Sequence, residues 1–428
     1  MKKYSITLLT IVLFVVLGFS AFTAAAEQKI ELKVWDVSFN EGYVRWWKNY
    51  VKEFNKANPN IEVTYETYET EAFKAKTAAS IVAGTMPDIF KLNPGAIAFK
   101  YYTEGKVLAI EDLYDVSPYM PGIKEGCSFN GKMIFHPLYM VPFAIYYNKA
   151  QFAEAGIDLQ KWADPTQPTW DEFIVACDKL KDAGFTPIAI GNASNWPFLA
   201  WVWILQNRFG GTKELIDAVS GVGSYTSPGF IKAAEVAQRF AQSGYFPKGF
   251  SSIGGNSMYI LLTQGNGAMF YFGTWVIGTI KDNAPPGFEY GVFKFPSFPD
   301  GNPDSQRDIY SVLTAFAVSS TTKHPEAVAK FLQPLTTSYD VMLSYIKEAS
   351  VIPAINGILE MAKTAGVDPV MLTVAQHFAE AKHGFGAWDW VLPAPVAEEM
   401  LNMSQPLSMG TITPKEFCER LEAKARQK

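Results

Sequence analysis

The sequence holds few of the residues that most often carry metal or nucleophilic chemistry. Its three cysteines, Cys127, Cys177 and Cys418, are too widely spaced for a disulfide framework or a C-x-x-C pair. Its four histidines lack the spacing of metal ligands, and no G-x-S-x-G segment is present. We therefore expect no metal and no cofactor, with the cysteines buried as small hydrophobic residues. A secreted glycosidase remains an alternative, because that class needs only two carboxylates.

Basic side chains are fewer than acidic ones in this sequence. The chain carries 37 lysines and arginines against 42 aspartates and glutamates, which gives a net charge of −5. Nucleic-acid-binding proteins present a basic face to the phosphates, so this balance argues against a nucleic-acid partner. After residue 26, no apolar run is long enough to cross a bilayer.

The longest apolar run lies at the start of the chain. A short basic end precedes an apolar stretch from residue 6 to 18, and Ala24 and Ala26 form an A-x-A site before Glu27. This pattern is typical of a secretory signal peptide covering residues 1–26, with a retained anchor helix as the alternative. Because no cysteine lies near the cleavage point, we expect a mature protein without a lipid anchor, working outside the cytoplasm.

The mature chain opens with alternating strand and helix patterns. Residues 30–37, 61–68 and 88–92 read as strands, and residues 43–58 and 72–82 read as the helices between them. Strands that alternate with helices at this spacing predict a parallel α/β sheet. A mature chain of about 400 residues favours two domains over one.

The alternation continues into the second half of the chain. Thr169 and Glu172 form a capping box that predicts the start of a helix. A strand is expected at 186–190, and a second strand at 268–272 runs into a helix that begins at Trp275.

One long pattern resembles a known family. Five blocks occur in the family's order: residues 85–114 (with P-D-I), 134–158 (with Y-Y-N-K), 168–191 (with W-D-E-F), 265–275 (with G-T-W) and 315–333 (with K-H-P-E-A). Together they resemble the family 1 extracellular solute-binding proteins of bacterial ABC importers. Each block alone is a weak signal, but five in order span nearly the whole mature chain.

The resemblance implies an α/β fold of two lobes, each a mostly parallel sheet flanked by helices, with a ligand cleft between them. The first lobe would combine 27–140 with 294–335, and the second would combine 141–293 with 336–428. The chain would cross between lobes near 140–143, 290–294 and 335–340. A signal peptide without a lipid anchor suits a periplasmic, monomeric member of the family.

The resemblance also places candidate ligand contacts after the strands of both lobes, where loops face the cleft. The candidates are Trp35, Asp36, Ser38, Thr70, Glu71, Asn93, Asn192, Asn195, Trp196, Trp275, Trp388 and Asp389. A turn or helix-capping role is the alternative for Asp36, Thr70 and Glu71. Of the two tryptophans in the W-D-W segment at 388–390, one is expected to contact ligand and the other to pack.

The function implied is capture of a neutral carbohydrate or polyol by cleft closure and its delivery to the permease subunits of an ABC transporter. Tryptophan rings cover the C–H faces of sugars while polar side chains bond to the hydroxyls. No arginine can be placed in the cleft, which favours a neutral ligand. A secreted glycosidase and a chemosensory receptor on the same fold are the alternatives.

Overall fold

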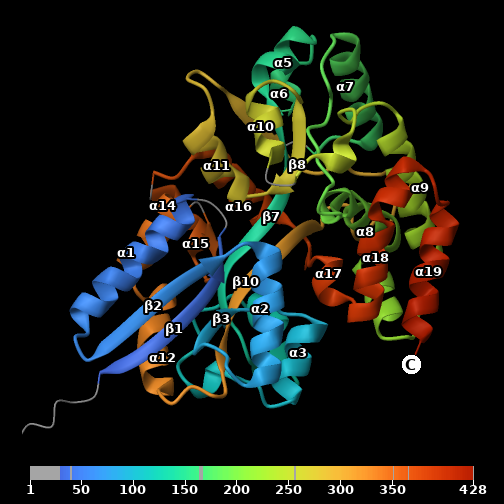
Figure 1. The fold of residues 1–428 in the computed structure, drawn as a ribbon. Coiled ribbons are helices and arrows are strands. Elements are labelled where there is room, and N and C mark those ends of the chain that lie inside the picture. Colours follow the sequence, from blue (N-terminus) through green and yellow to red (C-terminus); the bar gives the residue numbers. More distant parts are fainter. Residues whose placement is uncertain are drawn as a thin grey trace, which may run out of the picture.

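The computed structural model describes residues 29–38, 41–162, 167–254, 257–349, 351–364 and 366–427. The signal peptide expected at residues 1–26 lies outside these residues. Figure 1 shows two lobes: one holds β1 to β3 with α1 to α3, and the other holds β8, α5 to α9, α18 and α19. The long strands β7 and β10 run between the two lobes (Figure 1).

The strands vary from two to thirteen residues in length. They are β1 (Ile30–Val37), β2 (Ile61–Tyr68), β3 (Ile89–Lys91), β4 (Val107–Leu108), β5 (Ser128–Phe129), β6 (Lys132–Met133), β7 (His136–Asn148), β8 (Met269–Gly273), β9 (Tyr290–Phe293), β10 (Ile309–Ser319), β11 (Ile352–Pro353) and β12 (Gly384–Phe385).

Helices cover both lobes and dominate the last third of the chain. They are α1 (Glu41–Ala57), α2 (Thr70–Ala83), α3 (Ala96–Thr103), η1 (Ile110–Asp112), α4 (Pro121–Gly126), α5 (Lys149–Glu154), α6 (Leu159–Trp162), α7 (Trp170–Asp182), α8 (Trp196–Val219), α9 (Pro228–Gln242), η2 (Phe250–Ser252), α10 (Met258–Thr263), α11 (Trp275–Asn283), α12 (Pro325–Leu332), α13 (Pro334–Thr337), α14 (Tyr339–Ala349), α15 (Ile358–Thr364), α16 (Pro369–Glu380), α17 (Trp388–Val391), α18 (Ala394–Met409) and α19 (Pro414–Arg426).

The first lobe is built on a mixed sheet in the order β11-β7-β10-β3-β1-β2. Strand β1 pairs in parallel with β2 and with β3, as the alternating sequence pattern predicted. Strand β10 lies antiparallel to β3 and β7, so the sheet mixes both directions. Since the carboxyl ends of β1, β2 and β3 share one edge, the residues that follow them gather there.

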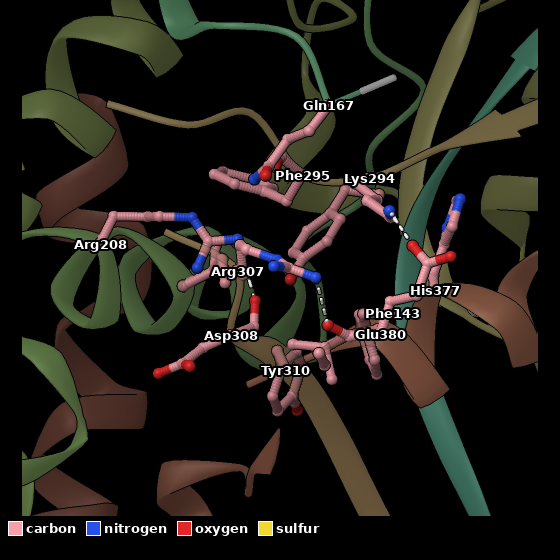
Figure 2. A pocket seen from close by; sticks show the side chains of 14 residues that line it. Phe143, Gln167, Arg208, Lys294, Phe295, Arg307, Asp308, Tyr310, His377 and Glu380 are labelled. Carbon is pink, nitrogen blue, oxygen red and sulfur yellow. Dashed lines mark hydrogen bonds and ion pairs between the residues drawn. The ribbon is translucent and has the colours of Figure 1, made fainter. Parts of the chain in front are cut away.

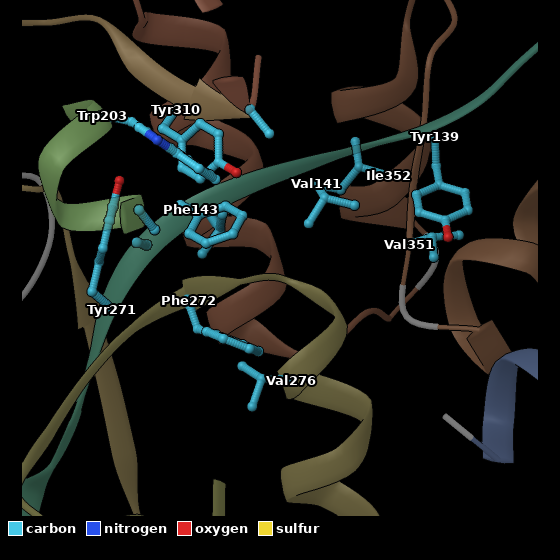
Figure 3. Packing of buried hydrophobic residues seen from close by; sticks show 14 of the residues in the cluster. Tyr139, Val141, Phe143, Trp203, Tyr271, Phe272, Val276, Tyr310, Val351 and Ile352 are labelled. Atoms are coloured by element: carbon cyan, nitrogen blue, oxygen red, sulfur yellow. The ribbon is translucent and has the colours of Figure 1, made fainter. Parts of the chain in front are cut away.

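Strand β7 belongs to both lobes. Its first half pairs with β10, ending at the Ser311–Pro142 pair, and its second half pairs with β8 from the Phe143–Gly273 pair onward. All thirteen of its residues are buried, which explains why its sequence lacks the alternation of a half-exposed strand. Figure 3 shows Phe143 beside Phe272 at this switch, with Val141 and Tyr139 farther along the strand.

Local signals predicted the start of α7 well. The Thr169 side chain accepts a hydrogen bond from the Glu172 amide, and the Glu172 carboxylate accepts one from the Thr169 amide at 2.9 Å. The reciprocal pair satisfies two amides that the first turn leaves free. The strand expected at 186–190 is reduced to a single bridge between Ile188 and Met269.

Helix α14 packs with the first lobe, although the sequence placed residues 336–428 in the second. The Trp46 indole donates a hydrogen bond to the Ser344 hydroxyl at 3.0 Å, and the Trp46 and Tyr345 rings lie 4.2 Å apart. Strand β11, just after α14, also pairs with the first half of β7. The chain regains contact with second-lobe strands at α16, which contacts β9.

Three further observations limit the chemistry of the described residues. No group of three or more His, Cys, Asp or Glu side chains among them is arranged to hold a metal ion. None of their helices combines the length and apolar character needed to cross a membrane. The three cysteines are buried and unpaired, and burial raises the pKa of each thiol, so all three stay protonated.

Candidate functional site

Two predicted tryptophans from different turns lie together in the second lobe. Trp196 opens α8 and Trp275 opens α11, and their ring centroids are 6.4 Å apart at an interplanar angle of 68°. Phe272 lies 5.2 Å from Trp196 and 4.9 Å from Trp275. We call these three side chains the aromatic wall. Both tryptophans are half-buried, so neither is fully enclosed in the core.

The aromatic wall stands at the junction between the lobes. The Trp275 ring lies 5.4 Å from Phe143, the residue at which β7 changes partners. Gly273 makes this placement possible, since a Cβ there would lie 2.5 Å from both the Trp275 ring and the Val141 side chain. The glycine in the F-G-T-W turn therefore lets the indole lie directly over the backbone.

The turn before Trp196 is held from behind by α18. The Asn192 amide donates to the Ser404 hydroxyl at 3.1 Å, and that hydroxyl donates to the Asn195 carbonyl. Gln405 donates to the Asn192 carbonyl at 3.3 Å. Asn195 has a positive φ of 66°, a conformation that asparagine tolerates better than most residues.

Asn192 is fully buried, and its side-chain oxygen accepts from the Phe198 amide at 3.1 Å. Its side chain thus fixes the turn, whereas Asn195 is half-buried and reaches the surface. Ser404 and Gln405 were missed from the sequence, because two polar residues inside a helix give no signal of what they hold.

Asp36, predicted as a ligand contact of the first lobe, has its carboxylate inside the core. Asp36 is fully buried and accepts hydrogen bonds from the hydroxyls of Tyr43 at 2.7 Å and Tyr65 at 3.0 Å. Burial raises the pKa of Asp36, while the ammonium of buried Lys91 and these hydrogen bonds act to lower it. Burial in turn lowers the pKa of Lys91 to about 8, partly offset by Asp36. In this structure Asp36 is a core residue.

Trp35 points to the opposite face of the same sheet, under α2. The Lys76 ammonium lies 4.1 Å from the ring centroids of both Trp35 and Tyr68. Lys76 also donates to the Tyr68 hydroxyl and lies 3.9 Å from the Glu66 carboxylate. The Trp35 ring is therefore covered by a cation from its own lobe rather than left open.

The other residues predicted as ligand contacts in the first lobe lie at the shared edge of β1, β2 and β3. Ser38 is half-buried, and its amide extends the pairing with β2 by donating to Tyr68 at 3.0 Å. Thr70 is exposed at the start of α2; Glu71 follows it in the helix. Asn93 is buried, and its side-chain oxygen has no hydrogen-bond partner among the described residues.

The W-D-W segment forms α17. Trp388 is fully buried, with its ring 5.1 Å from Phe230 and 6.5 Å from Trp203, so its faces are not available to a ligand in this structure. Asp389 is half-buried. Helix α17 contacts α3 of the first lobe and so marks a second place where the lobes meet.

A cavity of about 40 Å³ lies next to the junction, on the second-lobe side of the crossing strands. We call it the crossover cavity; it is lined by residues that include Phe143, Arg208, Tyr271, Lys294, Asp308 and Glu380. Figure 2 shows Arg208 on one side of it and the Lys294–Glu380 ion pair, 2.6 Å long, on the other. Sequence reasoning missed this cavity, because its residues come from seven separate segments of the chain.

Comparison with known proteins identifies a matching family and several relatives. The family model described as "Bacterial extracellular solute-binding protein" matches residues 40–338, more than half of the chain. The chain is 23% identical over 354 residues to a multiple sugar-binding protein of Streptococcus mutans, which covers 77% of this chain and 79% of that protein. It is 24% identical over 347 residues to the sn-glycerol-3-phosphate-binding periplasmic protein UgpB of Brucella melitensis, covering 74% of this chain and 76% of the relative.

Solved structures share the fold. A chitin oligosaccharide binding protein superposes with a TM-score of 0.82 at 21% identity, covering 93% of this chain and 98% of the other. The maltose-bound T. maritima protein MalE3 gives a TM-score of 0.76 at 17% identity, with 93% and 99% covered. These likenesses support the two-lobe α/β fold expected from the sequence. The chain therefore belongs to the bacterial extracellular solute-binding protein family.

Proposed function

We propose that this solute-binding protein captures a neutral carbohydrate or polyol between its two lobes and delivers it to the permease subunits of an ABC importer. The aromatic wall carries the proposal, because Trp196 and Trp275 expose ring surface at the junction of the lobes. Relatives named for binding sugars and structures solved with sugars support the same ligand class.

The chemistry of the wall suits a sugar ring. Aromatic faces cover the C–H faces of a pyranose with little demand on which hydroxyls it carries. Specificity then depends on the polar groups around the wall, because one unmatched buried polar group costs about 1–3 kcal/mol. Asn195 beside the wall and Asn93 at the edge of the first lobe are the candidates for that role.

A neutral ligand is favoured by the contacts that the charged side chains of the first-lobe sheet already make. Asp36 and Lys91 are both buried in the first lobe; each affects the pKa of the other, and Asp36 also bonds to Tyr43 and Tyr65. The Lys76 ammonium donates to the Tyr68 hydroxyl and lies 3.9 Å from the Glu66 carboxylate. A charged ligand would need a free opposite charge, and these side chains do not offer one.

Capture by closure follows from binding to two lobes at once. A ligand shifts the balance toward a closed form only by the contacts that it gains there. The closed form would then dock on the permease as a monomer. We place this protein in the periplasm, released after cleavage behind Ala26 and without a lipid anchor.

A thermal-shift screen tests the proposal. Neutral monosaccharides, oligosaccharides and polyols are compared with sn-glycerol 3-phosphate, amino acids and short peptides. A ligand at 100 times its dissociation constant stabilises the folded state by about 2.7 kcal/mol. We expect at least one neutral carbohydrate to do so, and a shift by phosphate esters or peptides alone would overturn the ligand class.

The same ligands separate binding from catalysis. Relatives of the family are binding proteins, so oligosaccharides incubated with the pure protein should be recovered intact. Cleavage that disappears on substitution of a carboxylate beside the aromatic wall would instead support the glycosidase alternative. Uptake of labelled ligand by cells lacking this chain separates transport from a purely chemosensory role.

A further inference from the structure

The crossover cavity holds a charge arrangement that carbohydrate binding does not explain. Its lining includes three cationic side chains, Arg208, Lys294 and Arg307, and two acidic ones, Asp308 and Glu380. The Glu380 carboxylate is paired with Lys294 at 2.6 Å. The cavity therefore carries one more positive charge than it has acids to balance it.

The acid nearest to Arg208 is already engaged elsewhere. One oxygen of the Asp308 carboxylate accepts from the Asn207 amide at 3.0 Å, and the other lies 3.1 Å from the His383 Nδ1 atom. Asp308 contributes to the field around Arg208, but the guanidinium bonds only to its backbone carbonyl, at 3.0 Å.

Arg208 itself is almost completely buried, at 1% exposure. Its other hydrogen bonds run to the carbonyls of Pro296 at 3.2 Å and Ser305 at 2.7 Å and to the Asn207 side-chain oxygen at 3.0 Å. Burial lowers the pKa of Arg208 to about 10, so it stays charged at neutral pH. A guanidinium has five N–H donors, and these bonds together with the Asp308 carbonyl use four, leaving one on Nη2.

A second unused donor lines the same cavity. The Tyr271 side chain is 4% exposed, and its hydroxyl has no hydrogen-bond partner within the described part of the chain. Burial raises the pKa of Tyr271, so the hydroxyl keeps its proton. An unmatched buried donor is rare in native proteins, and it points to a bound acceptor.

We propose that the crossover cavity binds one small inorganic anion of the halide class. The anion accepts hydrogen bonds from the Tyr271 hydroxyl and the free Nη2 hydrogen of Arg208, while Lys294 and Arg307 add attraction. The cavity, with a volume of about 40 Å³, has room for a chloride or bromide ion. A water molecule could accept the same bonds, but it would leave the surplus charge unbalanced.

An ion in the crossover cavity would lie beside both crossing strands, β7 and β10. Phe143 and Tyr310, one from each crossing strand, line the cavity and have ring centroids 4.2 Å apart. An ion held there stabilises the packing on which both crossing strands depend. The proposal does not rest on the carbohydrate site, and it can fail or hold independently of it.

Thermal unfolding of the full mature chain tests the anion site. Sodium chloride or bromide is titrated against sodium methanesulfonate at equal ionic strength. We expect a saturable rise in Tm with either halide, with a midpoint on the order of millimolar, and no such rise with the larger anion. Equal responses to all three salts would overturn the proposal.

A pair of tyrosine variants supplies the matched control. Tyr271→Phe removes the donor and keeps the ring, so the halide midpoint should rise about tenfold. Tyr146→Phe removes another buried hydroxyl of the second lobe that lacks a partner among the described residues, and its midpoint should not move. An unchanged midpoint in Tyr271→Phe would overturn the assignment.

Crystals grown in sodium bromide give a readout that does not depend on the folding of a variant. Anomalous diffraction from the wild-type chain should place a bromide between Tyr271 and Arg208. Ordinary water density at that point, with bromide found only at the surface, would show that the cavity is a solvent site and overturn the proposal.

Discussion

The end of β1 in the first lobe and the end of β8 in the second lobe use similar positions in opposite ways. Asp36 near the end of β1 is drawn inward, fully buried and bonded to Tyr43 and Tyr65. Trp275 after β8 stays half-buried, with its ring against Phe143 and Phe272. One strand end supplies a core residue, and the other supplies the half-buried ring that we propose contacts the ligand.

The difference depends on what stands beside each strand end. Helix α1 brings the Tyr43 hydroxyl within 2.7 Å of Asp36, so the carboxylate finds its partners inside the lobe. Gly273 removes the side chain that would displace Trp275, so a large ring rests on the backbone at the surface. A residue's place on a sheet edge thus restricts its role, but its neighbours decide it.

The largest effect is expected at Asp36. Asp36→Asn removes a buried charge that accepts hydrogen bonds from Tyr43 and Tyr65, and this should cost about 2–3 kcal/mol of unfolding free energy. Urea unfolding should show this loss, while calorimetry should show ligand affinity within about threefold of wild type. If the variant kept wild-type stability but lost ligand affinity, the contrast with Trp275 would be wrong, because Asp36 would then act on the ligand.

Trp275 should show the reverse pattern. Trp275→Ala removes a ring that we propose contacts the ligand, and carbohydrate affinity should fall about 30- to 100-fold, or about 2–3 kcal/mol, by calorimetry. Trp170→Ala is the matched control, since Trp170 is also half-buried in the second lobe but packs against Phe298, away from the aromatic wall. Equal affinity losses in both variants would mean that the effect comes from loosened packing.

Lys91 provides a pH test of the buried pair. Its folded-state pKa of about 8 lies below the usual value of 10.5, so the unfolded chain binds more protons between these values. Stability should therefore rise with pH, by about 2 kcal/mol between pH 8 and about 9.5, below the range where tyrosines ionise. Lys91→Met should remove this rise, and Lys52→Met, at an exposed position of α1, should keep it.

The smallest expected effect concerns the turn behind Trp196. Ser404→Ala removes the hydroxyl that links Asn192 to Asn195, and ligand affinity should fall about three- to fivefold, or about 1 kcal/mol. Ser408→Ala is the control, because the Ser408 hydroxyl donates to the Gln405 carbonyl within the same helix. If both variants bind equally well, the turn does not depend on α18 for its position.

Local sequence signals predicted the parts of the fold that depend on nearby residues. The strand pattern of 30–37 and 61–68 and the capping box at Thr169 were confirmed, because each is fixed by residues a few positions apart. The F-G-T-W turn likewise marked Trp275 as following a strand.

Features that depend on distant residues could not be read from the sequence. The partners of Asp36 include a helix seven residues on and a strand twenty-nine residues on, and nothing in W-D-V tells which way the carboxylate turns. Trp388 is buried by Trp203, which lies far away in the chain. The packing of α14 against Trp46 is a contact across 298 positions.

Pro142 gives the junction a mechanical property. It occupies the last position of β7 paired with β10, immediately before the strand turns to β8. Proline has no amide hydrogen, so one ladder bond is missing where the strand passes between lobes. We therefore expect β7 to bend more easily at this point than along its paired stretches. If the lobes close on a ligand, we expect the rotation to be centred on the crossing strands near Pro142.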